Sequence, residues 1–386
     1  MKKIKLGLLP KVLIAIALGI LCSLFFPDWL TRMFITFNDI FGNFLGLIIP
    51  LLILGLVAPG ITELGKGAGA LLLIPAAIAY LSTLHSGFFS YFTCRAVLPS
   101  MIGKEAFVNV DMTAKLTSYF TIEMQPLMSV TTALILAFVI GLGLTMVQGT
   151  TFNNLMIDLR DLINLVITNV IIPLLPLYVF GTFLHMGAEG TVVTILGIFI
   201  KVILVIFVMH IFLLLAQFIV AGVISGKNPF KALWNMLPAY ATALGTQSSA
   251  ATIPVTLEQA KKNGVRNEIA LFVIPLCATI HLSGSILKIV ACAFAISFVL
   301  GMPIDLATYA GFIFMLGITM VAAPGVPGGA IMAALGLLSS MLGFDASMQA
   351  IMIALYIAMD SFGTAANVTG DGAIALIVNT IKSKKE

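Results

Sequence analysis

Four polar side chains recur at helical spacing within an apolar segment near the C-terminus, and two of them are carboxylates. They lie at i, i+4, i+7 and i+11 and would share one helical face: Asp360, Thr364, Asn367 and Asp371. Carboxylates in an apolar helix are costly unless cations or polar partners meet them. The pattern predicts a path for ions and ammonium groups. The alternative for Asp371 is a merely solvated position near the end of the helix.

A second polar set lies in an earlier apolar segment. His281, Ser285 and Lys288 recur at i, i+4 and i+7, which again places them on one face of a helix. Histidine changes its charge near neutral pH, and Lys288 lies too deep in its segment to reach water easily along the helix. His281 and Lys288 are therefore candidate proton carriers, whereas His85 and His210 are more simply explained as structural residues.

The composition places these side chains in a membrane protein. Of the 386 residues, 60% are hydrophobic and 9% are charged, with a net charge of +4. Soluble chains are about 45–50% apolar and about 25% charged. The charge deficit excludes a soluble enzyme, a disordered chain and a nucleic-acid-binding protein. The four cysteines are isolated, so neither a disulfide framework nor a zinc site is expected.

Helices that cross the bilayer must position the polar residues, and each needs about 20 apolar residues. We predict an all-α integral membrane protein with eight transmembrane helices, the first of which is a span rather than a cleaved signal. The eight segments are 9–27, 36–60, 68–94, 127–147, 162–185, 192–224, 268–300 and 346–380.

Two further apolar stretches, 232–256 and 310–342, are interrupted by small residues, polar residues and prolines. The interruptions are Gly245–Pro254 and Ala322–Gly329. Backbone that is not helical at membrane depth must be buried in protein or line a wet cavity. We therefore expect two re-entrant hairpins beside a binding site. The order hairpin, span, hairpin, span indicates an inverted repeat.

The distribution of basic residues predicts the orientation. If both termini are cytoplasmic, most of the 20 lysines and arginines lie inside, as the positive-inside tendency requires. Those that would lie outside are Arg32, Arg95, Lys104 and Lys115. We expect a multi-pass protein of the inner (plasma) membrane with the lipid bilayer around it.

The segments around these interruptions resemble those of the dicarboxylate/amino acid:cation symporters, a family that includes glutamate transporters and bacterial serine/threonine transporters. The similar segments occur in order over 232–380: Ser248–Thr256, Pro275–Ser285, Ala323–Gly328 and Asn367–Asp371. The sequence Asn-Val-Thr-Gly-Asp in the last of them is the most specific.

The resemblance implies a homotrimer that works as an elevator. Scaffold spans 1 and 2 would occupy 1–65, and scaffold spans 4 and 5 would occupy 119–190. Span 3 with its outer loop, at 66–118, would move with the transport core at 191–386, which holds span 6, the first hairpin, span 7, the second hairpin and span 8.

The same resemblance implies a substrate site between the hairpin tips. Ser248 and Ser249 would face the carboxylate of the substrate, and Asp360 would bind its amino group. The other implied pocket residues are Thr364, Asn367, Gly363, Gly325 and Val326.

Sodium is the coupling ion that the resemblance implies, and no other cofactor is expected. The implied ligands are Thr279, His281, Ser283, Asn367, Asp371, Ala323, Tyr80 and Thr83. The family's Asn and Asp are replaced here by His281 and Ser283, which weakens one sodium site. Fewer sodium ions, or a proton carried by His281 or Lys288, would then drive each cycle.

A second departure concerns the substrate. Family members that carry acidic substrates have an arginine one turn after the aspartate, where this chain has Gly363, and its arginines at 32, 95, 160 and 266 all lie elsewhere. We expect a symporter that imports a small or neutral amino acid. The alternative is an organic-acid or acidic amino acid symporter that uses Lys288, with proton coupling through His281 or Lys288. From another class, a channel or an intramembrane enzyme remains open, although the sequence contains no H-E-x-x-H motif.

Overall fold

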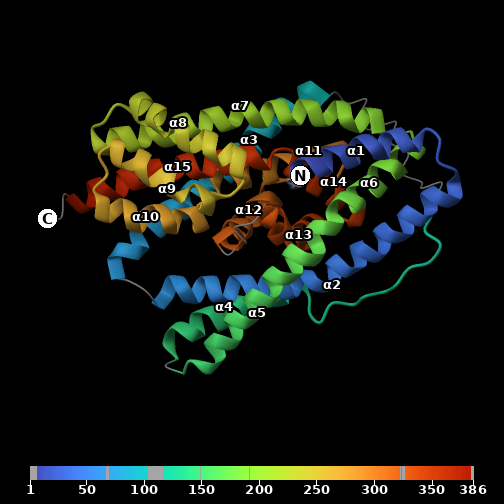
Figure 1. Cartoon of the computed structure of the whole chain (residues 1–386), viewed down its shortest axis with the longest axis horizontal. Helices are drawn as coiled ribbons and strands as arrows, with labels where there is room; N and C mark the ends of the chain where they lie inside the picture. The colour runs from blue at the N-terminus through green and yellow to red at the C-terminus, as the bar shows by residue number, and fades with distance from the viewer. Residues whose placement is uncertain are drawn as a thin grey trace, which may run out of the picture.

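The computed structural model describes residues 7–66, 69–102, 116–147, 149–190, 192–321, 323 and 327–383, and every regular element in these ranges is a helix. The helices, shown in Figure 1, are α1 (Leu8–Ser23), α2 (Asp28–Lys66), α3 (Gly69–Ile102), α4 (Val130–Met146), α5 (Thr151–Val166), the π-helix η2 (Ile167–Ile171), α6 (Ile172–Ala188), α7 (Val192–Ser225), α8 (Pro229–Thr246), α9 (Ser249–Lys262), α10 (Asn267–Ile280), α11 (Ser283–Val299), α12 (Leu306–Val321), α13 (Gly329–Leu342), α14 (Ala346–Ala358) and α15 (Asp360–Ser383).

Each of the eight predicted spans coincides with a helix or with consecutive helices. Within the described residues, five helices are long and apolar enough to cross a membrane, or six if the bent pair α14 and α15 is one span. The first and fourth predicted spans correspond to α1 and α4, whose apolar parts are shorter. The chain is therefore an all-α protein with several membrane-spanning helices, and the count of eight stays a prediction.

The seventh and eighth predicted spans are broken rather than continuous. The helix ends at Ile280 and begins again at Ser283, while α14 and α15 meet at an angle of 60°. The prediction that His281, Ser285 and Lys288 share one face of a helix is therefore wrong, because His281 lies in the break. The break is stabilised from α15, where Asn367 Oδ1 accepts hydrogen bonds from the backbone N–H groups of Gly284 (2.8 Å) and Ser285 (3.3 Å).

Each predicted hairpin corresponds to two consecutive helices, α8 and α9 in the first and α12 and α13 in the second. In the first, Gln247 adopts a left-handed φ of 54° between α8 and α9, and its Nε2 donates to Ser361 Oγ in α15 at 2.9 Å. In the second, Gly328 has a φ of 77° immediately before α13. Each hairpin is followed by a broken helix, α10–α11 or α14–α15. This recurrence of four elements supports the predicted repeat.

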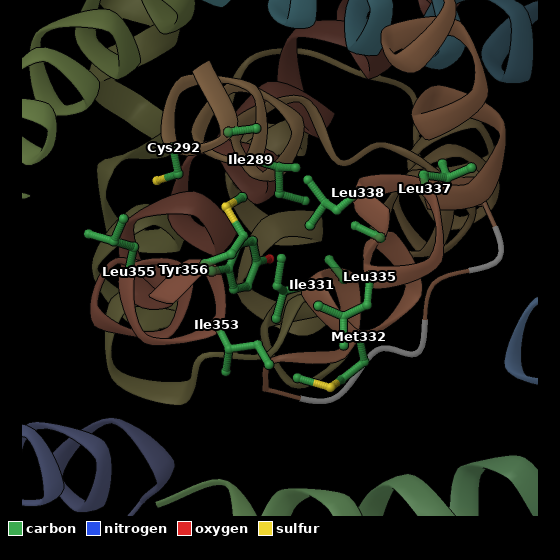
Figure 2. Close-up of a cluster of buried hydrophobic side chains, with 14 of the residues drawn as sticks. Ile289, Cys292, Ile331, Met332, Leu335, Leu337, Leu338, Ile353, Leu355 and Tyr356 are labelled. Atoms are coloured by element: carbon green, nitrogen blue, oxygen red, sulfur yellow. The ribbon is translucent and has the colours of Figure 1, made fainter. Parts of the chain in front are cut away.

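The helices pack in two regions. The N-terminal half contributes α2, which packs against α4, α5 and α6, and α1, which packs against α6. Figure 1 shows α7, α8, α9, α10 and α15 gathered in the other region, where α15 contacts all four of the others. Between them, α11, α13 and α14 form an apolar core around Ile289, Ile331 and Ile353 (Figure 2), and α11 also packs against α3. This core fixes where the ends of α11, α13 and α15 meet.

The restart of α11 depends on a close approach to α15 at Gly284. A Cβ at this position would lie 2.7 Å from Ala366 Cβ and 2.7 Å from the carbonyl oxygen of Gly363. We expect Gly284→Ala to destabilise the protein by about 1–3 kcal/mol, because the backbone oxygen cannot move aside easily. Thermal unfolding in detergent measures this. Gly197→Ala in α7 is the matched control, since nothing lies within 4 Å of its added Cβ, and equal melting shifts for the two variants would contradict the expectation.

Candidate functional site

A cavity of about 70 Å³, with polar side chains among its lining residues, lies where the ends of the broken helices and the hairpin helices converge. Helix ends carry backbone groups without intrahelical partners, which makes such convergence suited to binding a small polar solute. The cavity is lined by Gln247, Ser249, Ala278, Thr279, Leu282, Ser285, Ala323, Ala330, Tyr356, Asp360, Thr364 and Asn367.

Several predicted site residues meet at this cavity and others do not. Four of the predicted substrate residues line it, one of which (Asn367) is also a predicted ion ligand, together with two further predicted ion ligands: Ser249, Asp360, Thr364, Asn367, Thr279 and Ala323. Ser248 instead caps α9, where its Oγ accepts the N–H of Ala251 at 3.3 Å. Gly363 is buried outside the lining. Gly325 and Val326 lie outside the described residues.

Both carboxylate oxygens of Asp360 already have partners. Oδ1 lies 2.9 Å from the ammonium nitrogen of Lys288, and Oδ2 accepts the backbone N–H of Gly328 at 2.8 Å. The side chain of Asp360 is 7% exposed and that of Lys288 is 0% exposed. Asp360 thus lines the cavity and is paired, on the side away from the cavity, with the fully buried ammonium of Lys288.

Lys288 is held on three sides. Its Nζ lies 3.5 Å from the centroid of the Tyr356 ring and 3.4 Å from the carbonyl oxygen of Met359. A Cβ at Gly363 would lie 2.7 Å from Lys288 Cε and 2.8 Å from Nζ. The glycine at position 363 therefore makes room for the lysine. The prediction that Lys288 could bind an acidic substrate directly does not fit this arrangement, in which its charge is engaged with Asp360.

A second polar cluster lies around Asp371, whose exposed fraction is 1%, so the solvated alternative for this residue is wrong. His281 Nδ1 lies 2.9 Å from Asp371 Oδ1, and its Nε2 lies 3.0 Å from Ser82 Oγ. Gln217 Nε2 donates to Ser82 Oγ (3.0 Å) and to Ser283 Oγ (3.1 Å). The cluster joins α3, α7, the break between α10 and α11, and α15.

Two predicted ion ligands on α3 are directed elsewhere. Tyr80 donates its hydroxyl to the carbonyl of Phe314 in α12 at 3.4 Å, and Thr83 donates to Ala79 in its own helix at 2.8 Å. Ser82 is the α3 residue that contacts His281. Sequence reasoning also missed Gln217 and Tyr356. The only signal for Gln217 was an amide within an otherwise apolar span, and Tyr356 had none.

Broken helices and paired hairpins that meet around a cavity with a carboxylate and other polar side chains in its lining are typical of a secondary membrane transporter. Comparison with known proteins agrees, because residues 8–381 match the Sodium:dicarboxylate symporter family, and the chain belongs to this family. Its members are transporters, so the enzyme alternative no longer stands.

Three relatives illustrate the range of the family. The chain is 28% identical over 383 residues to a serine/threonine transporter of Acinetobacter baumannii, with 95% of each chain covered. It is 30% identical over 146 residues to a rat neutral amino acid transporter B(0), which covers 38% of this chain and 26% of that protein. It is 27% identical over 254 residues to human excitatory amino acid transporter 2, which covers 63% of this chain and 43% of that protein.

Proposed function

We propose that this protein is a sodium-coupled symporter that imports a small, net-neutral amino acid. The observation that carries the proposal is the cavity of about 70 Å³, which presents one carboxylate with hydroxyl and amide groups and has no arginine among its described lining residues. The printed names of the relatives, serine/threonine transporter and neutral amino acid transporter, support the same class of substrate.

The helix ends suit a zwitterion. The N-terminus of α9 begins at Ser249, which lines the cavity, and helix N-termini favour carboxylates through their free N–H groups. Asp360 supplies the partner for the amino group, as it lines the same cavity. Because Asp360 and Lys288 already cancel in charge, a net-neutral ligand keeps the site neutral, whereas an anion adds a buried charge that costs free energy.

Coupling to a cation is supported by buried oxygens that have no hydrogen-bond partner among the described residues. These are Asp371 Oδ2, Gln217 Oε1 and Thr369 Oγ1. Oxygen atoms are the ligands that hard cations prefer. Asn367 Oδ1 is engaged with the N-terminus of α11 and Ser283 Oγ with Gln217, so we propose fewer sodium ions per cycle than the sequence resemblance implies.

Transport is proposed to follow the elevator scheme in a homotrimer of the inner membrane with cytoplasmic termini. The moving part would be 66–118 and 191–386, and the fixed part would be 1–65 and 119–190. In support, the described residues that line the cavity, from Gln247 to Asn367, all belong to the proposed moving part, so a rigid movement would carry the ligand with it.

A second candidate substrate is a small carboxylate without an amino group. The ion pair between Lys288 and Asp360 favours it, because the carboxylate that would bind an amino group is already paired. In this case the carboxylate of the ligand would bind at the N-terminus of α9, and the ion pair between Lys288 and Asp360 would stay intact.

A thermal-shift screen separates these candidates. The purified protein would be heated with each of the twenty amino acids and with the matching 2-hydroxy acids, with and without sodium. A ligand at about 100 times its Kd stabilises the folded state by about 2.7 kcal/mol. We expect a small neutral amino acid to raise the melting temperature only with sodium present. Stabilisation by hydroxy acids alone would establish the second candidate, and stabilisation by neither would contradict the proposed function.

A further inference from the structure

The surroundings of the Lys288 ammonium are those that an amino group of a ligand would need. It lies 2.9 Å from a carboxylate oxygen of Asp360, 3.4 Å from the carbonyl oxygen of Met359 and 3.5 Å from the centre of the Tyr356 ring. Carboxylates, carbonyls and aromatic faces are the partners that stabilise a desolvated ammonium. The chain therefore supplies its own ammonium at the carboxylate of the proposed substrate site.

The two members of the pair approach the cavity differently. Asp360 lines the cavity, whereas Lys288 has no exposed surface and reaches Asp360 through the space left by Gly363. A ligand can thus meet Asp360 from the cavity while Lys288 meets it from behind. Two ammonium groups that share one buried carboxylate repel each other, so binding of one weakens the contact with the other.

We propose that Lys288 is an internal substitute for the amino group of the substrate. In the unloaded site it neutralises Asp360, and when an amino acid binds it withdraws to the Tyr356 ring and the Met359 carbonyl. This inference rests on the proposed function and deepens it. Its consequence is that the moving part can return without substrate and without an unpaired buried carboxylate. Such an unpaired charge would otherwise oppose this return step.

The contrasting account is a permanent ion pair that only stabilises the fold. It predicts that substituting Lys288 changes stability and alters all transport modes alike. The substitute account predicts that ligand affinity and the return of the empty carrier change in opposite directions, because Lys288 competes with the ligand but assists the return. Net uptake requires the empty carrier to return, whereas exchange of internal for external substrate does not.

The test compares Lys288→Met with the wild-type protein in proteoliposomes. We expect amino acid affinity to rise by about tenfold, because the variant lacks the ammonium that competes with the ligand for Asp360. Exchange should persist, while the ratio of net uptake to exchange falls by about tenfold or more, because an unpaired buried carboxylate opposes the return. Lys201→Met is the matched control. Its ammonium donates to Met101 O at 2.6 Å within a span and lies outside the site.

Lys288→Arg provides a second measurement that does not depend on the folding of the methionine variant. A guanidinium binds a carboxylate in a bidentate manner, so it should compete more strongly with the ligand. We expect weaker amino acid binding and an almost unchanged ratio of net uptake to exchange. Unchanged affinity in Lys288→Arg, or an equal loss of both transport modes in a folded Lys288→Met protein, would overturn the proposal. Absence of both modes in the wild-type protein would instead refute the proposed function.

Discussion

The Asp360→Asn variant is expected to lose amino acid binding. Hydrogen bonds to charged groups contribute about 1.5–3 kcal/mol, so removing the negative charge should weaken binding by about 10- to 150-fold. The same change leaves Lys288, which is 0% exposed, without its carboxylate partner, and breaking such a pair typically costs about 3–5 kcal/mol of stability. Isothermal titration with the amino acid found in the screen, at saturating sodium, measures the affinity.

A double variant separates the two effects of this substitution. Asp360→Asn combined with Lys288→Met removes both charges, so stability should recover while amino acid binding stays lost. A small carboxylate without an amino group should still bind to either variant if it is the true ligand. Amino acid affinity that is unchanged in a folded Asp360→Asn protein would show that Asp360 is not the partner of the amino group.

The Asp371→Asn variant is expected to uncouple amino acid binding from sodium. Asp371 is 1% exposed, and its Oδ2 has no hydrogen-bond partner among the described residues. An amide of similar shape keeps an oxygen there but removes the charge that makes the site attractive to a cation. We expect the sodium concentration for half-maximal thermal stabilisation to rise by about tenfold or more, equivalent to about 1.4 kcal/mol.

The exposed Glu258→Gln variant is the control for this experiment. Glu258 forms a surface ion pair with Lys262 at 3.0 Å, and such pairs contribute little. Its sodium dependence should match the wild-type curve. If Asp371→Asn also matched that curve, the carboxylate of Asp371 would have no part in sodium binding.

The positions of the helices could be predicted from the sequence because apolar length alone determines where a chain can cross a bilayer. All eight predicted spans fall on helices, and the first hairpin interruption contains the left-handed Gln247 between α8 and α9. The breaks at His281 and Met359 could not be predicted in this way. The first is stabilised by Asn367, 83 residues from Gly284 along the chain, and a contact of that kind leaves no local signal.

The pairing of the site residues was likewise beyond sequence reasoning. Lys288, Asp360, His281 and Asp371 were all recognised as charged or titratable groups at depth, where each needs a partner. Which of the two basic side chains meets which carboxylate depends on the packing of α11 against α15. His281 lies in the break before α11 and contacts Asp371, whereas Lys288 lies within α11 and contacts Asp360. A continuous helix would have placed His281 and Lys288 on the same side.

Uptake of radiolabelled L-serine into proteoliposomes that contain the purified protein tests the central claim most directly. With an inward sodium gradient, the account predicts that serine accumulates inside above its external concentration, because the ion gradient drives the symport. Without a gradient, serine should only equilibrate. Accumulation to the same level with and without sodium, or no uptake of serine or any other small neutral amino acid, would contradict the account.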